Sequence, residues 1–117
     1  MISIKEIDHK KIELCFELDS NTICLWTKKQ WESEFKKRGV KVVAIFLRKT
    51  IIGIYVVQTI IDEVQINYFS IKYKFRRKGY GSYLMSYLIQ QSEKSSIKKL
   101  LLEVSAKNLI AEAFYTK

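Results

Sequence analysis

The chain has 117 residues, of which 48% are hydrophobic and 28% are charged, a composition typical of one globular domain and not of a disordered chain. No apolar run reaches the roughly 20 residues that span a bilayer, which excludes an ordinary membrane-spanning helix. Lysine and arginine number 21 against 12 acidic residues, and the net charge of +9 favours an anionic partner such as nucleic acid, a ribosome, an acidic protein or a phosphorylated cofactor.

The N-terminal third predicts one strand and two helices. Residues 2–7 alternate apolar and polar side chains, as a strand does. A short helix follows, marked by the spacing of Ile12, Cys15, Phe16 and Asp19. Residues 27–30, Thr-Lys-Lys-Gln, have the form of a capping box that opens a second helix. Trp31 and Phe35 lie at helical spacing in it, and Gly39 suits its C-terminal cap.

The middle and end of the chain predict a sheet with one crossover helix. Residues 41–49 and 51–60 favour an antiparallel hairpin, and Asp62-Glu63 turns the chain into a strand over 64–72. The next helix carries one stripe that we expect to face the core: Tyr80, Tyr83, Leu84, Tyr87 and Leu88. Residues 98–105 indicate a buried strand. A strand, helix and strand in this order imply parallel neighbours, so we expect a mixed α/β (α+β) domain whose sheet is otherwise antiparallel.

The segment between the predicted strand at 64–72 and the helix from residue 80 is the basic sequence RRKGYG. A helix N-terminus presents unpaired N–H groups and the positive end of its dipole. Gly79 and Gly81 carry no Cβ atoms that would keep a ligand from those amides, and they allow positive φ. The spacing matches neither a Walker A loop nor a dinucleotide fingerprint. Anion binding and a plain glycine turn with solubilising cations are both compatible with it.

Three runs together carry a resemblance to a known family. They are GIYVVQTIIDEVQINYFSI at 53–71, FRRKGYGSYLMSYLI at 75–89 and LLLEVSAKNLIAEAFY at 100–115. With R-x-x-G-x-G, then L-E-V, then N-x-x-A-x-x-x-Y, the chain resembles the GNAT acetyltransferase superfamily. In particular, it resembles the RimI-like ribosomal-protein-alanine N-acetyltransferases. The resemblance implies the GNAT (acyl-CoA N-acyltransferase) fold and acetyl-CoA as cosubstrate.

The same resemblance assigns roles to individual residues. Backbone groups of Phe69 and Ile71, with Ser70 between them, would hold the pantetheine arm and the acetyl carbonyl. The pyrophosphate would lie against the loop and first helical turn, at Arg76, Arg77, Lys78, Gly79, Tyr80, Gly81 and Ser82. Asn108 would also contact the cofactor. Glu103 matches the family's general base and Tyr115 its general acid.

Elementary chemistry is compatible with these roles. A carboxylate at the end of a strand can take a proton from an attacking amine, and a tyrosine can protonate a departing thiolate. Each residue also has a purely structural reading, because Glu103 could be a solvated carboxylate, Asn108 a helix cap and Tyr115 a packing residue. Cys15, Cys24 and His9 form neither a disulfide framework nor a metal site, so we expect no metal.

The resemblance implies transfer of an acetyl group from acetyl-CoA to a protein N-terminal amine, here an N-terminal alanine of a small-subunit ribosomal protein. Lysine and small amines remain open as acceptors. A CoA-binding remnant without turnover and a basic ribosome- or RNA-binding domain are the alternatives. We expect a cytoplasmic monomer or weak dimer, with no membrane and no direct nucleic-acid contact. Relatives continue through two further strands, so we expect 1–117 to be one domain, truncated at its C-terminus.

Certain positions depart from the family pattern. Tyr73 stands where the family commonly has proline, Ser105 where it often has arginine, and Tyr68 where it often has asparagine. These departures bear on the acceptor and leave the cofactor loop intact.

Overall fold

The computed structural model describes residues 1–95 and 97–102. Along the chain the described elements are β1 Ile2–Ile7, α1 Ile12–Ser20, α2 Lys28–Lys36, β2 Val40–Leu47, β3 Thr50–Ile60, β4 Glu63–Ile71, α3 Tyr80–Lys94 and β5 Lys99–Leu102. Short 3-10 turns lie at His9–Lys11 and Tyr73–Phe75. No helix of this described part is long and apolar enough to cross a membrane.

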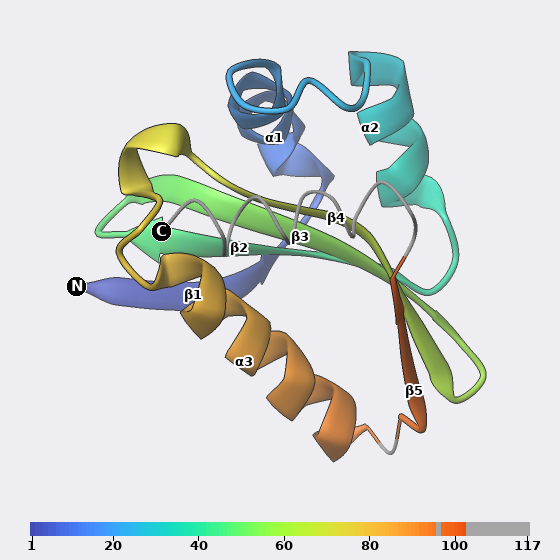
Figure 1. The fold of residues 1–117 in the computed structure, drawn as a ribbon. Helices are drawn as coiled ribbons and strands as arrows, with labels where there is room; N and C mark the ends of the chain where they lie inside the picture. The colour runs from blue at the N-terminus through green and yellow to red at the C-terminus, as the bar shows by residue number, and fades with distance from the viewer. Residues whose placement is uncertain (96, 103–117) are drawn as a thin grey trace.

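The sheet of the described residues has the strand order β1-β2-β3-β4-β5. β1 to β4 pair antiparallel with their neighbours, whereas β5 pairs parallel with β4. Figure 1 shows α1 and α2 on one face of this sheet and α3 on the other. The prediction of a mixed α/β domain with one parallel strand–helix–strand unit is therefore confirmed.

Two apolar clusters hold these layers together, one on each face of the sheet. On the α3 face, strand residues such as Phe69 and Ile71 pack with Leu84 and Leu88 of the helix. On the α1/α2 face, residues such as Val56 and Tyr68 pack with Trp31. Successive strand residues alternate between the clusters because side chains in a strand point to opposite faces.

A β-bulge interrupts this alternation in β4. Tyr68 lies opposite Val56 and Ile66 lies opposite Val57, so Asn67 is an extra residue with no partner on β3. An extra residue moves every later side chain to the other face. Ile66 belongs to the α3-face cluster, whereas Tyr68 belongs to the α1/α2-face cluster.

The capping box that opens α2 is confirmed: Gln30 N donates to Thr27 Oγ1 and Thr27 N donates to Gln30 Oε1. The predicted C-terminal cap at Gly39 is wrong, because the helix ends with Lys37 in extended conformation. Gly39 instead has a φ of 78° in the turn before β2. A Cβ atom there would lie 2.7 Å from the Thr59 carbonyl oxygen, so the turn requires glycine.

Two predictions of burial are also wrong. Tyr83 is 54% exposed, because the buried face of α3 is centred on Gly81, Leu84 and Leu88 and residue 83 lies to one side of it. In β5, Leu100 and Leu101 are 36% and 43% exposed. The first part of this strand lies at the edge of the described sheet, which leaves its side chains less covered than those of a central strand.

We expect Tyr55 and Tyr68 to ionise only when the chain unfolds. Burial raises the pKa of both phenols well above the ordinary value, with Asp19 adding to the rise at Tyr68. The unfolded chain loses these protons near pH 10, so the free energy of unfolding should fall above that pH by about 1.4 kcal/mol per pH unit for each group. A phenolate absorbance titration followed alongside circular dichroism measures this.

Tyr55→Phe tests this assignment. Removing the buried phenol should reduce the absorbance change that accompanies unfolding and leave the change that precedes unfolding as it is in the wild-type chain. Ionisation of Tyr55 with the circular dichroism unchanged would contradict the prediction.

Candidate functional site

The loop before α3 has the backbone of an anion-binding turn. Gly79, the N-cap residue, has a φ of 86°, and Arg77 also has a positive φ of 64°. A Cβ atom built on Gly79 would meet nothing within 4 Å, so the space beside its backbone is open to a ligand. Gly81 is buried in the first helical turn and shows no positive φ, so the expectation of positive φ holds for Gly79 alone.

Arg76 braces this loop against the end of β4. Its Nε donates to the carbonyl oxygen of Ile71 at 2.9 Å, and its guanidinium lies 4.0 Å from the centre of the Tyr73 ring. The Tyr73 hydroxyl in turn donates to the carbonyl oxygen of Thr22, between α1 and α2. The loop is thereby joined to β4 and to the opposite helical layer.

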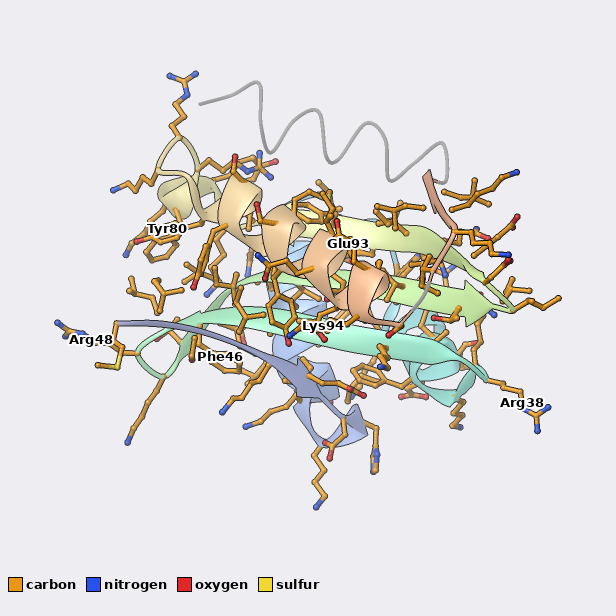
Figure 2. All side chains as sticks on the ribbon, turned by 90° about the horizontal axis from the view of Figure 1, so that it is seen from below. Arg38, Phe46, Arg48, Tyr80, Glu93 and Lys94 are labelled. Atoms are coloured by element: carbon orange, nitrogen blue, oxygen red, sulfur yellow. The ribbon has the colours of Figure 1, made fainter. Side chains whose placement is uncertain are left out.

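Further cations surround the same end of the molecule. Arg48, Lys72 and Lys74 line a surface hollow of about 450 Å³ together with Phe75. Figure 2 shows Arg48 and Tyr80 at one end of the molecule and Arg38 at the other. Cations around a helix N-terminus raise the local concentration of anionic ligands.

The edge of β4 beyond the bulge presents backbone groups to the side away from β3. Lys72 N donates to Ile52 O, and backbone groups of an antiparallel strand alternate in direction. Those of Phe69 and Ile71 therefore point away from β3. On that side, β4 pairs with the described residues of β5 from Glu63–Lys99 to Ile66–Leu102. The backbone groups of the two predicted sites therefore face the β5 side of β4.

A fully buried carboxylate, Asp19, organises the α1/α2 side of this region. Its Oδ1 accepts from Leu25 N and the Tyr68 hydroxyl, and its Oδ2 accepts from Trp26 N and Trp31 Nε1, at 2.9–3.1 Å. Four donors meet the four lone-pair directions of one carboxylate, which offsets the cost of burying its charge. Asp19 therefore links α1, the following loop, α2 and β4.

The groups around Asp19 are aromatic and tightly packed. Trp26, Trp31 and Tyr68 lie with ring centroids 4.8–5.2 Å apart, a separation typical of attractive aromatic pairs. Burial, with Asp19 nearby, raises the pKa of the Cys15 thiol to about 12, so this thiol is protonated at neutral pH. These contacts identify Trp26 and Trp31 as packing residues.

A second buried carboxylate, Glu34, lies against the bulge. Its Oε1 accepts from Asn67 Nδ2 at 3.3 Å, and its Oε2 forms an ion pair with Lys37. Glu34 and Asn67 are each 5% exposed. Sequence reasoning missed both, although Glu34 stands three residues after Trp31, next to the apolar stripe of α2, where a charged side chain is unexpected.

The structure describes most of the predicted site residues but not all of them. Phe69, Ser70 and Ile71 lie on β4, and Arg76 to Ser82 form the loop and first turn of α3. Glu103, Asn108 and Tyr115 lie outside the described residues.

Comparison with known proteins places the chain in a family. The sequence model of the Acetyltransferase (GNAT) family matches residues 9–117. No curated protein sequence matches the chain.

Solved structures with the same fold include two ribosomal-protein-alanine N-acetyltransferases. The S18-alanine enzyme of Escherichia coli is 21% identical, with a TM-score of 0.86 over 99% of this chain and 75% of that one. The enzyme of Brucella melitensis biovar Abortus 2308 is 14% identical, with a TM-score of 0.75 over 89% and 80%.

A third similar structure contains a ligand. The PaiA N-acetyltransferase of Thermoplasma acidophilum, in complex with coenzyme A, is 16% identical, with a TM-score of 0.72 over 99% of this chain and 87% of that one. At such identities all three likenesses show the fold.

We expect Asp19→Asn to lower the free energy of unfolding by about 2–4 kcal/mol, because an amide has only one oxygen and leaves at least two of the four donors unsatisfied. Urea unfolding measures the loss. The matched control is Asp8→Asn, at an exposed N-cap where asparagine replaces aspartate with little cost. A loss at position 19 no larger than the loss at position 8 would contradict the prediction.

Proposed function

The chain belongs to the GNAT family of acetyltransferases, and from this premise we propose that it transfers the acetyl group of acetyl-CoA to the N-terminal amine of a protein. Enzymes of this family are acetyl-CoA-dependent N-acetyltransferases. The observation that carries the proposal for this chain is the loop at 76–82. It joins a strand to a helix N-terminus, has a left-handed glycine at the N-cap, and leaves the space beside that glycine open.

The described residues fit the two ends of the cosubstrate. Amides of the loop and first turn of α3 would bind the pyrophosphate, because Gly79 leaves their approach unobstructed and Lys78 and Arg77 add positive charge. Backbone groups of Phe69 and Ile71 would bind the pantetheine arm and the acetyl carbonyl. Their direction away from β3 supports this assignment.

The proposed reaction is a direct transfer within a ternary complex. The neutral amine attacks the thioester carbonyl, so a C–N bond forms and the C–S bond breaks. Glu103 takes the proton that the amine loses, directly or through water, and Tyr115 protonates the departing thiolate. An N–H donor on β4 stabilises the oxyanion of the tetrahedral intermediate.

An N-terminal amine is the acceptor that we propose, and an N-terminal alanine of a ribosomal protein is the specific candidate. An α-amino group has a pKa of about 7.7–8.0, so a useful fraction is neutral at physiological pH, whereas lysine at about 10.4 is almost wholly protonated. The likeness of fold to two ribosomal-protein-alanine N-acetyltransferases supports the candidate.

Acetyl-CoA should raise the Tm of the purified chain. A ligand at one hundred times its Kd stabilises a folded protein by about 2.7 kcal/mol, which corresponds to several degrees in Tm. Gly79→Glu should abolish the rise, because a carboxylate would stand in the phosphate site.

Gly79→Lys is the matched control, since it imposes the same strain at positive φ with the opposite charge and should retain part of the rise. A thermal scan with and without acetyl-CoA compares the variants. An unchanged Tm for the wild-type chain at saturating acetyl-CoA would overturn the cofactor assignment.

Glu103→Gln should keep the acetyl-CoA-dependent rise in Tm and lower kcat by roughly 10²–10⁴-fold, the usual contribution of a general base. Mass spectrometry of a peptide with a free N-terminal alanine measures the turnover. Normal turnover by this variant would show that another group accepts the proton. Cofactor binding without turnover by the wild-type chain would favour a CoA-binding remnant.

A further inference from the structure

The bulge residue Asn67 holds a hydrogen-bond acceptor without a partner. Its Nδ2 donates to Glu34 Oε1, and this bond fixes which end of the amide faces the carboxylate. Its Oδ1 is buried and meets no hydrogen-bond partner among the described residues. A buried carbonyl oxygen without a donor costs about 1–3 kcal/mol, so its retention calls for an explanation such as a ligand that supplies the N–H.

Glu34 already binds a primary ammonium in this structure. The Lys37 Nζ forms an ion pair with Glu34 Oε2, and the Lys37 side chain is 45% exposed whereas that of Glu34 is 7% exposed. The carboxylate is therefore fixed, and the ammonium lies at the end of a flexible stem that solvent reaches. Because solvent reaches the Lys37 ammonium, another amine can take its place against the buried carboxylate, and Glu34 then stays paired throughout.

The position of this pair suits an acceptor. Asn67 lies in β4 two residues before Phe69, whose backbone group we assign to the acetyl carbonyl or pantetheine arm. The proposed pyrophosphate loop leads into α3, on the other face of the sheet (Figure 1). The Glu34–Asn67 pair thus lies on the α1/α2 face of the sheet, and α3, which begins at the proposed cofactor loop, lies on the other face.

We propose that Glu34 and Asn67 form the subsite that receives the acceptor's primary amine, and that Lys37 occupies this subsite until the acceptor displaces it. The inference rests on the proposed function. Oε2 of Glu34 accepts one N–H of the incoming group and Oδ1 of Asn67 accepts another. A primary amine or ammonium has enough N–H donors for both, whereas a hydroxyl or thiol has one hydrogen.

Steady-state kinetics with a hexapeptide that has a free N-terminal alanine tests the subsite. Glu34→Gln and Asn67→Ala should each raise the peptide KM by about tenfold or more, as expected when a hydrogen bond to an amine is lost, with the acetyl-CoA KM unchanged. Lys37→Met should lower the peptide KM severalfold, because it removes the internal competitor. Lys36→Met, at the neighbouring exposed lysine, is the matched control and should change neither constant.

The opposite signs separate this role from a structural one. Loss of the ion pair in either Glu34→Gln or Lys37→Met could weaken folding, but only the subsite makes the peptide KM rise in one and fall in the other. A peptide KM that is unchanged in Glu34→Gln and Asn67→Ala, or that rises in Lys37→Met, overturns the inference and leaves the proposed function standing.

A binding measurement covers a chain that does not turn over. The free peptide should raise the Tm of the wild-type chain in the presence of CoA more than the same peptide with a blocked N-terminus, and Glu34→Gln should remove the difference. Equal effects of the two peptides overturn the inference. The absence of any effect of acetyl-CoA itself overturns the proposed function instead.

Discussion

The single extra residue in β4 is the constraint on which the rest of this structure depends. If Asn67 paired as an ordinary strand residue, Tyr68 would share a face with Ile66 and lie towards α3. Because Asn67 is bulged, Tyr68 turns to the α1/α2 layer, and Phe69 and Ile71 keep their side chains on the α3 face. The bulge therefore sets which side chains of β4 pack against each helical layer.

On the α1/α2 side of the sheet, the Tyr68 hydroxyl donates a hydrogen bond to the buried carboxylate of Asp19. Its carboxylate accepts hydrogen bonds from α2, from β4 and from the loop that joins α1 to α2, and it makes a rigid unit of segments far apart in the sequence. Arg76 and Tyr73 extend this connection to the loop before α3. The proposed cofactor loop and the α1/α2 layer are thus parts of one hydrogen-bonded framework.

This framework is compatible with the binding of both proposed substrates, acetyl-CoA and the acceptor amine, to one sheet. The loop at 76–82 leads into α3, which lies on the face of the sheet opposite α1 and α2 (Figure 1). On the α1/α2 face, Asn67 donates a hydrogen bond to Glu34 of α2. In β4, the apolar side chains of Phe69 and Ile71 cover the α3 face of the sheet. The polar side chain of Asn67 lies on the other face, against Glu34. In the proposed ternary complex, this separation would let both partners reach β4 without displacing each other.

Local patterns in the sequence determine much of this protein. Alternation predicts β1, runs of β-branched and aromatic residues predict β2 and β3, and the turn at Asp62-Glu63 leads into β4. The Thr27–Gln30 pair predicts the start of α2, and R-x-x-G-x-G predicts the proposed cofactor loop. Each of these signals depends on residues close along the chain. A change of phase between Ile66 and Phe69 is the one local sign of the bulge. Only the tertiary structure shows that Asp19 meets Tyr68, that Glu34 meets Asn67 and that Tyr83 faces solvent. These outcomes depend on which distant segments pack together, and a buried charge is stable only where such packing brings it donors.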